Sequence, residues 1–160
     1  MDRTRALTLT HTVGGSALED LRRWLSDDSL AGGADNDYIQ GADGFNDTID
    51  GGDGYDVVAY AFGGSNTPVS FTATGTSTQP DGLGGTDTLL NIEEVHIFGG
   101  NAGDVLVGSG GRNYMMGNGG IDTLTGGGGR DTFAFDLLQL NGVDRITDFS
   151  VDDDIYFQNF

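Results

Sequence analysis

Cysteine is absent from the 160 residues of this sequence, proline occurs only twice, and lysine plus arginine total 7. Without cysteine, no disulfide can stabilise the fold, whatever compartment it occupies. Because so little proline accompanies 29 glycines, a collagen-like chain is excluded. Glycine loses much conformational entropy when it is ordered, so something besides an ordinary apolar core must stabilise this chain.

Positive charge is scarce relative to negative charge. The 25 Asp and Glu residues outnumber the 7 Lys and Arg residues, and the formal net charge is −18. Phosphate contacts need a basic surface, so we expect no nucleic-acid partner, and an anionic membrane is disfavoured. The acids recur at fixed intervals among glycines rather than in blocks, which argues against an acidic disordered segment and favours cations as partners.

Long apolar runs and catalytic motifs are also missing. Residues 1–15 lack the apolar stretch of a secretory signal, and no segment approaches the roughly 20 apolar residues of a transmembrane span. The histidines, His11 and His96, lie far apart and outside any H-E-x-x-H pattern, and His96 lies in an alternating stretch typical of a strand. Neither a G-x-S-x-G elbow nor a G-K-[ST] phosphate loop is present. We therefore expect no catalytic residues and no organic cofactor.

What the sequence does contain is a glycine-rich repeat of nine residues. From Gly99 it reads GGNAGDVLV, GSGGRNYMM, GNGGIDTLT and GGGGRDTFA without a gap. Glycine, an acid or its amide, and a large apolar residue keep the same phase in all four units, which indicates a true repeat. The sixth positions are Asp104, Asn113, Asp122 and Asp131, and the eighth positions are Leu106, Met115, Leu124 and Phe133.

A second block of the same repeat lies upstream. Its units are GGADNDYIQ from Gly32, GADGFNDTID from Gly41 and GGDGYDVVA from Gly51, and the middle unit carries one extra residue. The in-phase acids are Asp37, Asp47 and Asp56, and the in-phase apolar residues are Ile39, Ile49 and Val58.

These units match the pattern G-G-x-G-x-D-x-U-x, in which U is a large apolar residue. On these residues the chain resembles the haemolysin-type, or RTX, calcium-binding repeat family over roughly two fifths of its length. GGTDTLLNIEEV (residues 84–95) resembles the linker that often precedes a repeat run in this family, and DRITDF (residues 144–149) resembles the strand pair that closes it. The resemblance implies a C-terminal module of a bacterial protein exported by type I secretion.

The composition of the unit predicts its local structure. Glycines in the first six residues permit positive φ and close backbone approach, so this part turns the chain, whereas the last three residues suit a short strand. Two units make one coil, and stacked coils predict an all-β fold, a two-sheet parallel β-roll of right-handed solenoid type. We expect its interior to contain the apolar residues Ile39, Val58, Leu106, Met115, Leu124 and Phe133.

Stacking also brings acids together. Turns from units n and n+2 would lie about 4.8 Å apart, with Asp104 near Asp122 and Asp37 near Asp56. Carboxylates this close repel one another unless a cation lies between them. Calcium accepts roughly 6 to 8 oxygen ligands from carboxylates and carbonyls, whereas magnesium demands tighter octahedral geometry and zinc prefers His or Cys. The sequence therefore predicts several Ca²⁺ ions, roughly two to five.

By resemblance to the family, each ion is held by sixth-position acids and by carbonyl groups of the preceding loop. The ligand residues that this implies are Gly33, Asp35, Asp37, Gly51, Asp53, Asp56, Gly100, Ala102, Asp104, Ser109, Gly111, Asn113, Gly117, Gly119, Asp122, Gly126, Gly128 and Asp131.

Several of these residues depart from the ideal repeat. Asn113 retains an oxygen but lacks an acid's charge, and Ala102 at position four is expected to strain its loop. Asp35 occupies position four of the first unit, and the extra residue before Asp47 sets that half-site apart. The C-terminal acids have two readings, as further ligands or as solvated turn residues; they are Asp144, Asp148, Asp152, Asp153 and Asp154.

The blocks divide the chain into five segments. Residues 1–31 are a predicted N-terminal cap whose short helix, Ser16–Leu25, could alternatively dock a neighbouring domain or partner. Residues 32–59 and 99–135 are the two repeat blocks, and residues 136–160 are predicted capping strands. Residues 60–98 are predicted to form a strand-and-loop insertion, with a flexible linker and irregular turns of the same roll as alternatives.

Two functions remain open. The first is a non-catalytic module that folds on binding extracellular Ca²⁺, at about 10⁻⁴–10⁻³ M, and thereby supports the secretion, folding and stability of a secreted protein. The alternative is the C-terminal module of a secreted metalloprotease, lipase or alginate epimerase, or of an adhesin that binds polysaccharide or a cell surface. Both readings imply an extracellular location, and the first implies contact with the type I secretion machinery.

Overall fold

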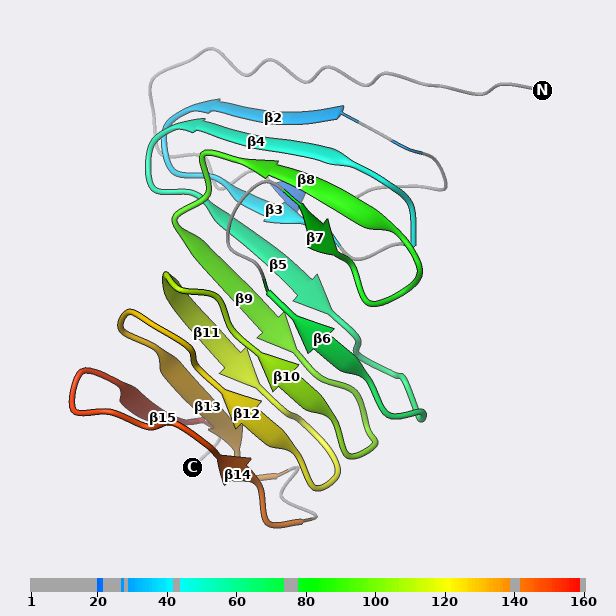
Figure 1. Ribbon diagram of the computed structural model, residues 1–160, viewed down its shortest axis with the longest axis vertical. Helices are drawn as coiled ribbons and strands as arrows, with labels where there is room; N and C mark the ends of the chain where they lie inside the picture. The colour runs from blue at the N-terminus through cyan, green and yellow to red at the C-terminus, as the bar shows by residue number, and fades with distance from the viewer. Residues whose placement is uncertain are drawn as a thin grey trace.

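The computed structural model describes residues 20–21, 27, 29–41, 44–73, 78–138 and 142–158, and every regular element within these ranges is a β-strand. The strands stack along the long axis of the molecule as a parallel β-roll (Figure 1). The predicted all-β class and parallel roll are therefore confirmed. The described residues include no helix that could cross a membrane.

One face of the roll is a seven-stranded sheet in which every neighbouring pair is parallel. Each strand in this sheet lies later in the chain than the neighbour before it, so the coils advance in one direction. The order is β1 (Asp20–Leu21), β3 (Tyr38–Gln40), β5 (Val57–Ala61), β9 (Glu94–Phe98), β11 (Arg112–Met116), β13 (Thr132–Asp136) and β15 (Asp154–Gln158).

The opposite face consists of two four-stranded sheets. The first has the order β2 (Ser29–Ala34), β4 (Thr48–Asp53), β8 (Thr86–Leu90) and β7 (Gln79–Pro80). The second has the order β6 (Ser70–Thr72), β10 (Val105–Val107), β12 (Thr123–Thr125) and β14 (Arg145–Ile146). All neighbours are parallel except β7, which runs antiparallel to β8.

The core is one line of apolar side chains between the two faces. The six residues predicted to form it, Ile39, Val58, Leu106, Met115, Leu124 and Phe133, are all fully buried, and Ile49 joins them. Equivalent residues of successive coils lie side by side, as Leu106 does with Leu124. Burial of each such side chain contributes about 1.5–3 kcal/mol, so the core alignment determines how the coils stack.

The described residues between the two repeat blocks are built into the roll. β9 lies between β5 and β11, so the two repeat blocks share one continuous seven-stranded sheet. On the opposite face, β6 pairs with β10 and β8 pairs with β4. Because β6 and β8 belong to separate sheets, this face is divided between the two blocks (Figure 1).

A buried carboxylate organises the loop before β8. Asp81 is fully buried, and its Oδ1 accepts backbone N–H groups from Leu83, Gly84 and Gly85 at 2.8–3.0 Å. Its Oδ2 accepts the N–H of Gly44 at 2.6 Å. Four backbone donors thus compensate the burial of this carboxylate, as hydrogen bonding must for any buried charge.

The two ends of the roll are formed by β1 and by β14 with β15. The helix predicted over Ser16–Leu25 lies outside the described residues except for Asp20 and Leu21, which form β1 and pair with β3. At the other end, β14 and β15 complete a further coil on β12 and β13. Apolar side chains are exposed around this last coil, with Val151 99% and Val143 83% accessible.

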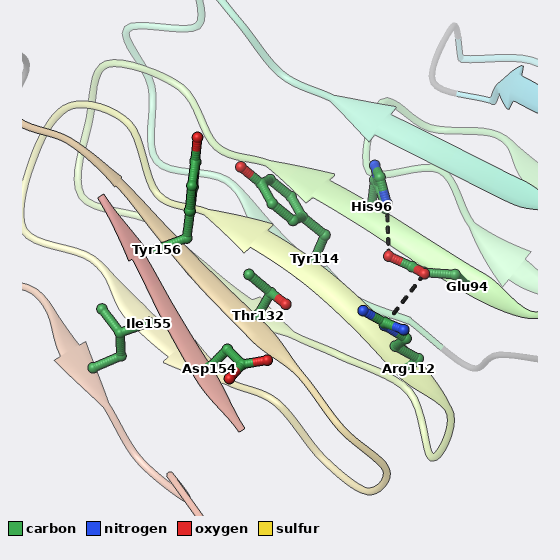
Figure 2. A pocket seen from close by; sticks show the side chains of 8 residues that line it. All are labelled: Glu94, His96, Arg112, Tyr114, Thr132, Asp154, Ile155 and Tyr156. Atoms are coloured by element: carbon green, nitrogen blue, oxygen red, sulfur yellow. Dashed lines mark hydrogen bonds and ion pairs between the residues drawn. The ribbon is translucent and has the colours of Figure 1, made fainter. Parts of the chain in front are cut away.

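A pocket of about 500 Å³ lies on the outer surface of the seven-stranded sheet, across β9, β11, β13 and β15 (Figure 2). Side chains alternate along each strand, so the residues of this pocket on β9 and β11 face away from the apolar core.

Candidate calcium-binding turns

The sixth-position acids of successive coils form a ladder. Asp122 Oδ1 accepts the backbone N–H of Asp104 at 2.7 Å, and Asp104 Oδ1 accepts the N–H of Val69 at 2.8 Å. Asp144 continues the ladder, because its Oδ1 accepts the N–H of Asp122 at 2.9 Å. At this edge of the roll, each carboxylate therefore binds the backbone of the preceding coil at the equivalent position.

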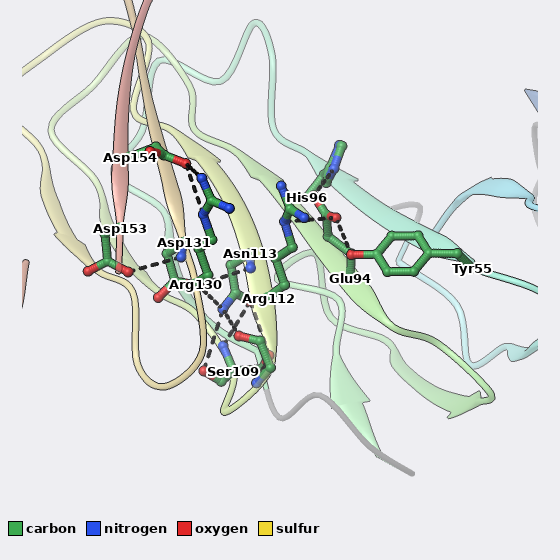
Figure 3. Close-up of polar contacts among 11 residues, drawn as sticks. Tyr55, Glu94, His96, Ser109, Arg112, Asn113, Arg130, Asp131, Asp153 and Asp154 are labelled. Atoms are coloured by element: carbon green, nitrogen blue, oxygen red, sulfur yellow. Dashed lines mark hydrogen bonds and ion pairs between the residues drawn. The ribbon is translucent and has the colours of Figure 1, made fainter. Parts of the chain in front are cut away.

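The same arrangement occurs at the other edge of the second block. Asp131 Oδ1 accepts the N–H of Asn113, and Asp153 Oδ1 accepts the N–H of Asp131, both at 3.0 Å (Figure 3). The coil between Asp131 and Asp153 is 22 residues long, against 18 for the coil before it. The extra residues leave the strand register intact, since Thr132 still pairs with Asp154.

In the first block, Asp56 Oδ1 accepts the N–H of Asp37 at 2.8 Å. Glu93 takes the next place, because its Oε2 accepts the N–H of Asp56 at 2.8 Å. On the opposite edge, Asp87 Oδ1 accepts the N–H of Asp47 at 3.0 Å. The coil from Asp37 to Asp56 is 19 residues long, and the coil from Asp56 to Glu93 is 37 residues long, because the sequence carries insertions in both.

Four ladder acids thus lie outside the nonapeptides, namely Asp87, Glu93, Asp144 and Asp153. Of these, Asp144 and Asp153 were candidates from the sequence, whereas Asp87 and Glu93 were missed. Asp87 has a local signal, because GGTDTLL contains two glycines, an acid and, two residues on, a large apolar residue. Glu93 has none, since its position depends on the register of β9 against β5.

The ladders of the two blocks are not collinear. In the seven-stranded sheet Val58 pairs with Val95, and Val95 pairs with Asn113. An eighth-position residue of the first block therefore lies level with a sixth-position residue of the second. Because of this two-residue offset at β9, the acids of the first block do not continue into those of the second.

Burial of the ladder carboxylates is nearly complete. Asp56 and Asp122 are 0% exposed, and Asp104 and Asp131 are 1% exposed. The second oxygen, Oδ2, of both Asp56 and Asp122 is buried without a hydrogen-bond partner. An ionised carboxylate in that condition is costly unless a proton or a cation compensates its charge.

The pKa values of these carboxylates also indicate that their negative charge is not compensated. Burial raises the pKa of Asp122 from 3.8 to about 6, opposed by the hydrogen bond from the Asp104 backbone and reinforced by the nearby carboxylates of Asp144 and Asp104. Burial likewise raises the pKa of Asp56 and of Asp131. These carboxylates lack positive charge from the protein, so the donor set fits a hard cation.

Backbone carbonyls complete the oxygen surface of the turns. In five of the units the first glycine packs directly against the sixth-position carboxylate, so a Cβ on Gly117 would overlap Asp122 and one on Gly51 would overlap Asp56. Among the described residues, no three His, Cys, Asp or Glu side chains cluster closely enough to hold a metal by themselves. Any ion here must therefore take many of its ligands from carbonyl groups, as calcium does readily.

Most of the predicted loop ligands lie in these turns. Gly100 and Ser109 each use a carbonyl oxygen to accept an N–H from the next coil, and Asp53 accepts one from Asp35. The carbonyls of Asp35, Ala102 and Gly111 each lie against a glycine of the next coil. Of the remaining predicted loop residues, four lie in the same stacked turns, namely Gly117, Gly119, Gly126 and Gly128, whereas Gly33 lies within β2 and Gly51 within β4.

At position four of the repeat, the expectation that Ala102 strains its loop is wrong. Ala102 does not strain its loop, because it is not among the described non-glycine residues with positive φ, which are Asp35, Asn91 and Asn118. The strained residue is Asp35, whose φ of 134° falls where the equivalent Gly54 has 155° and Gly129 has 94°. A β-carbon in this region costs about 1–3 kcal/mol.

Asn113 supplies its own donors at its turn. Its Nδ2 donates to the carbonyls of Gly111 at 2.8 Å and Gly126 at 3.1 Å, and to Asp131 Oδ1 at 2.8 Å (Figure 3). Its Oδ1 accepts the N–H and the hydroxyl of Ser109. The amide therefore meets the oxygens that an ion would otherwise bind at this turn. A comparable donor serves Asp87, whose Oδ2 accepts the buried hydroxyl of Tyr60 at 3.0 Å.

Comparison with known proteins agrees with this geometry. The family model described as the RTX calcium-binding nonapeptide repeat matches residues 25–58 and 97–134, in four copies. No curated protein matches the chain. The two matched segments coincide with the two repeat blocks, so the family assigned from the sequence is confirmed for them.

Proposed function

We propose, from the premise that this chain carries RTX calcium-binding nonapeptide repeats, that it is a module whose β-roll folds when calcium binds. The observation that carries the proposal is Asp122, which is fully buried with one oxygen lacking a hydrogen-bond partner. Folding without a cation would leave this charge uncompensated in the interior, which opposes the folded state.

The residues assigned to calcium are the buried ladder acids and the carbonyls around them. Asp104, Asp122 and Asp144 would serve one edge of the second block, and Asp131 with Asp153 the other. In the first block, Asp56 is the acid whose free oxygen best supports a site. When bound, calcium supplies the positive charge that these carboxylates lack, and its flexible coordination by oxygen suits a turn made of carbonyls. Magnesium would fit poorly, because it retains its waters.

The biological role that follows is a folding switch set by location. Extracellular calcium modules bind at about 10⁻⁴–10⁻³ M, so the chain would remain loosely structured in a low-calcium cytosol. Export as an unfolded chain by a type I system, followed by folding outside, fits a module of this kind. The absence of cysteine is compatible with that route.

A calcium titration followed by far-UV circular dichroism tests the proposal, with magnesium as the control. We expect a cooperative gain of β-sheet signal and a higher melting temperature with calcium only. A chain that is already folded in EDTA, and whose melting temperature calcium leaves unchanged, would refute it.

A second candidate is a binding module within a larger secreted protein, either an enzyme or an adhesin. The pocket on the outer face of the seven-stranded sheet favours it, because the repeat fold does not require that pocket. Assays of the isolated chain against casein, esters and alginate would distinguish a catalytic part from a binding part. Activity lost on substitution of His96 would establish the catalytic reading.

A further inference from the structure

The pocket across β9, β11, β13 and β15 combines aromatic rings with charged groups. Tyr114 from β11 and Tyr156 from β15 line the same end of it, and Thr132 and Asp154 lie toward the other end (Figure 2). Tyr156 is 51% exposed although it is a large aromatic residue. A volume of about 500 Å³ is within the range of small-ligand pockets.

The rings extend beyond the pocket as a continuous strip. The ring centroid of Tyr114 lies 5.1 Å from that of His96 and 5.9 Å from that of Phe98. His96 in turn lies 5.5 Å from Tyr38, in an edge-on contact. The strip therefore crosses β3, β9 and β11 on the face of the sheet that points away from the core, and Tyr156 on β15 lies beyond it, across β13.

The charged groups of the pocket cancel one another. Glu94 contacts His96 Nε2 at 2.8 Å and Arg112 Nε at 3.5 Å, and Asp154 pairs with Arg130 at 2.7 Å (Figure 3). Burial lowers the pKa of His96, opposed by its contact with Glu94, which favours the neutral imidazole at pH 7. Arg112 lines the pocket with Glu94 and Asp154, and Arg130 pairs with Asp154 from outside the lining, so these four side chains carry no net charge in a chain of net charge −18.

These features discriminate among ligand classes. A polyanion would be repelled by the net charge of the chain. A cation would be repelled by the guanidinium group of Arg112, which lines the pocket. A purely apolar partner would bury the paired charges without new hydrogen bonds, which is costly. A neutral carbohydrate meets none of these objections, because its C–H faces stack on rings and its hydroxyls bond to carboxylate and guanidinium groups.

We propose that this pocket binds a neutral carbohydrate, stacked on Tyr114 and Tyr156 and hydrogen-bonded to Arg112, Thr132 and Asp154. The rings provide contact area with little loss of side-chain freedom, and the paired charged groups hold their hydrogen-bonding atoms in place. The inference goes beyond calcium binding, and it depends on calcium only in needing the folded roll.

Binding is tested on the full chain in calcium, by calorimetry with neutral hexasaccharides of glucose, mannose and N-acetylglucosamine and with hexagalacturonate as an acidic comparator. We expect at least one neutral sugar to bind and the acidic one to bind more weakly. Tyr156→Ala should weaken binding by about tenfold or more, whereas Tyr156→Phe should retain most of it. Val151→Ala, at an exposed position outside the pocket, is the matched control.

Three results would overturn the proposal: no binding of any neutral sugar, preference for the acidic sugar, or equal affinity of Tyr156→Ala and the wild type. The far-UV spectrum and calcium midpoint of each variant are measured alongside. If the wild-type chain folds with calcium but binds no sugar, the carbohydrate site alone is rejected. If the wild-type chain does not respond to calcium, the folding switch is rejected.

Discussion

Asp122 and Asp104 are joined across adjacent coils, because Oδ1 of Asp122 accepts the N–H of Asp104 at 2.7 Å while its Oδ2 is buried with no hydrogen-bond partner. One oxygen of the carboxylate therefore positions the turn, and the other is available to a cation. Asn113 provides the contrasting case, in which an amide meets the surrounding oxygens itself.

Replacing Asp122 with Asn should make one turn resemble that of Asn113. We expect the folding equilibrium in EDTA to shift toward the folded state by about 1–3 kcal/mol, seen as more β-sheet signal in far-UV circular dichroism, because an uncompensated buried charge is removed. We also expect the number of calcium ions bound, measured by calorimetry, to fall. Asp152→Asn, which changes an exposed acid, should alter neither quantity. A loss of stability in EDTA would contradict this account of Asp122.

The reciprocal change, Asn113→Asp, should create a calcium site. It removes the amide donor to Gly111, Gly126 and Asp131 and places a second carboxylate beside Asp131. We expect one additional ion at saturating calcium and, in EDTA, a further shift of about 1–3 kcal/mol toward the unfolded state. An unchanged ion count would mean that this turn cannot hold calcium even with its acid restored.

Acid should stabilise the calcium-free chain. The folded pKa of Asp122 is about 6, above its ordinary value of 3.8, so ionisation opposes folding. This penalty is fully present above about pH 6, decreases as the pH falls through that value, and vanishes below 3.8. The shift corresponds to at most about 3 kcal/mol. Far-UV circular dichroism in EDTA at a series of pH values measures it, and the β-sheet signal should rise as the pH falls through about 6.

With calcium present, acid should oppose folding instead of favouring it. Protons and calcium compete for the buried carboxylates, so the calcium midpoint should move to higher concentration as the pH falls through about 6. A calcium midpoint that does not change with pH would show that these carboxylates are not ligands.

Glycine at position one should be indispensable. A Cβ on Gly117 would overlap the carboxylate of Asp122, whereas a Cβ on Gly110 would meet no atom within 4 Å. We expect Gly117→Ala to lower the free energy of unfolding in calcium by about 2 kcal/mol or more, and Gly110→Ala by less than about 0.5 kcal/mol. Chemical denaturation of both variants in calcium makes the comparison. Equal effects would show that the packing under Asp122 tolerates a methyl group.

Much of the fold could be predicted because the repeat is local. The nine-residue period places an apolar residue at each strand centre, and Leu106, Met115, Leu124 and Phe133 are buried as expected. The same period identifies Asp122 and Asp131 as turn acids. Residues 60–98 have no such period, so their division between β6 on one sheet and β8 on the other was not predictable.

The sequence by itself determined the chemistry of the turns, because glycine conformation, carboxylate charge and apolar spacing act within nine residues. The tertiary structure decided which residues meet. It brought Asp87 and Glu93 into the acid ladders, gave the Asn113 amide its partners, and placed Tyr156 beside Tyr114. These contacts join residues from 18 to 42 positions apart, and they depend on strand register between coils, which the packing of the core sets and no local pattern specifies.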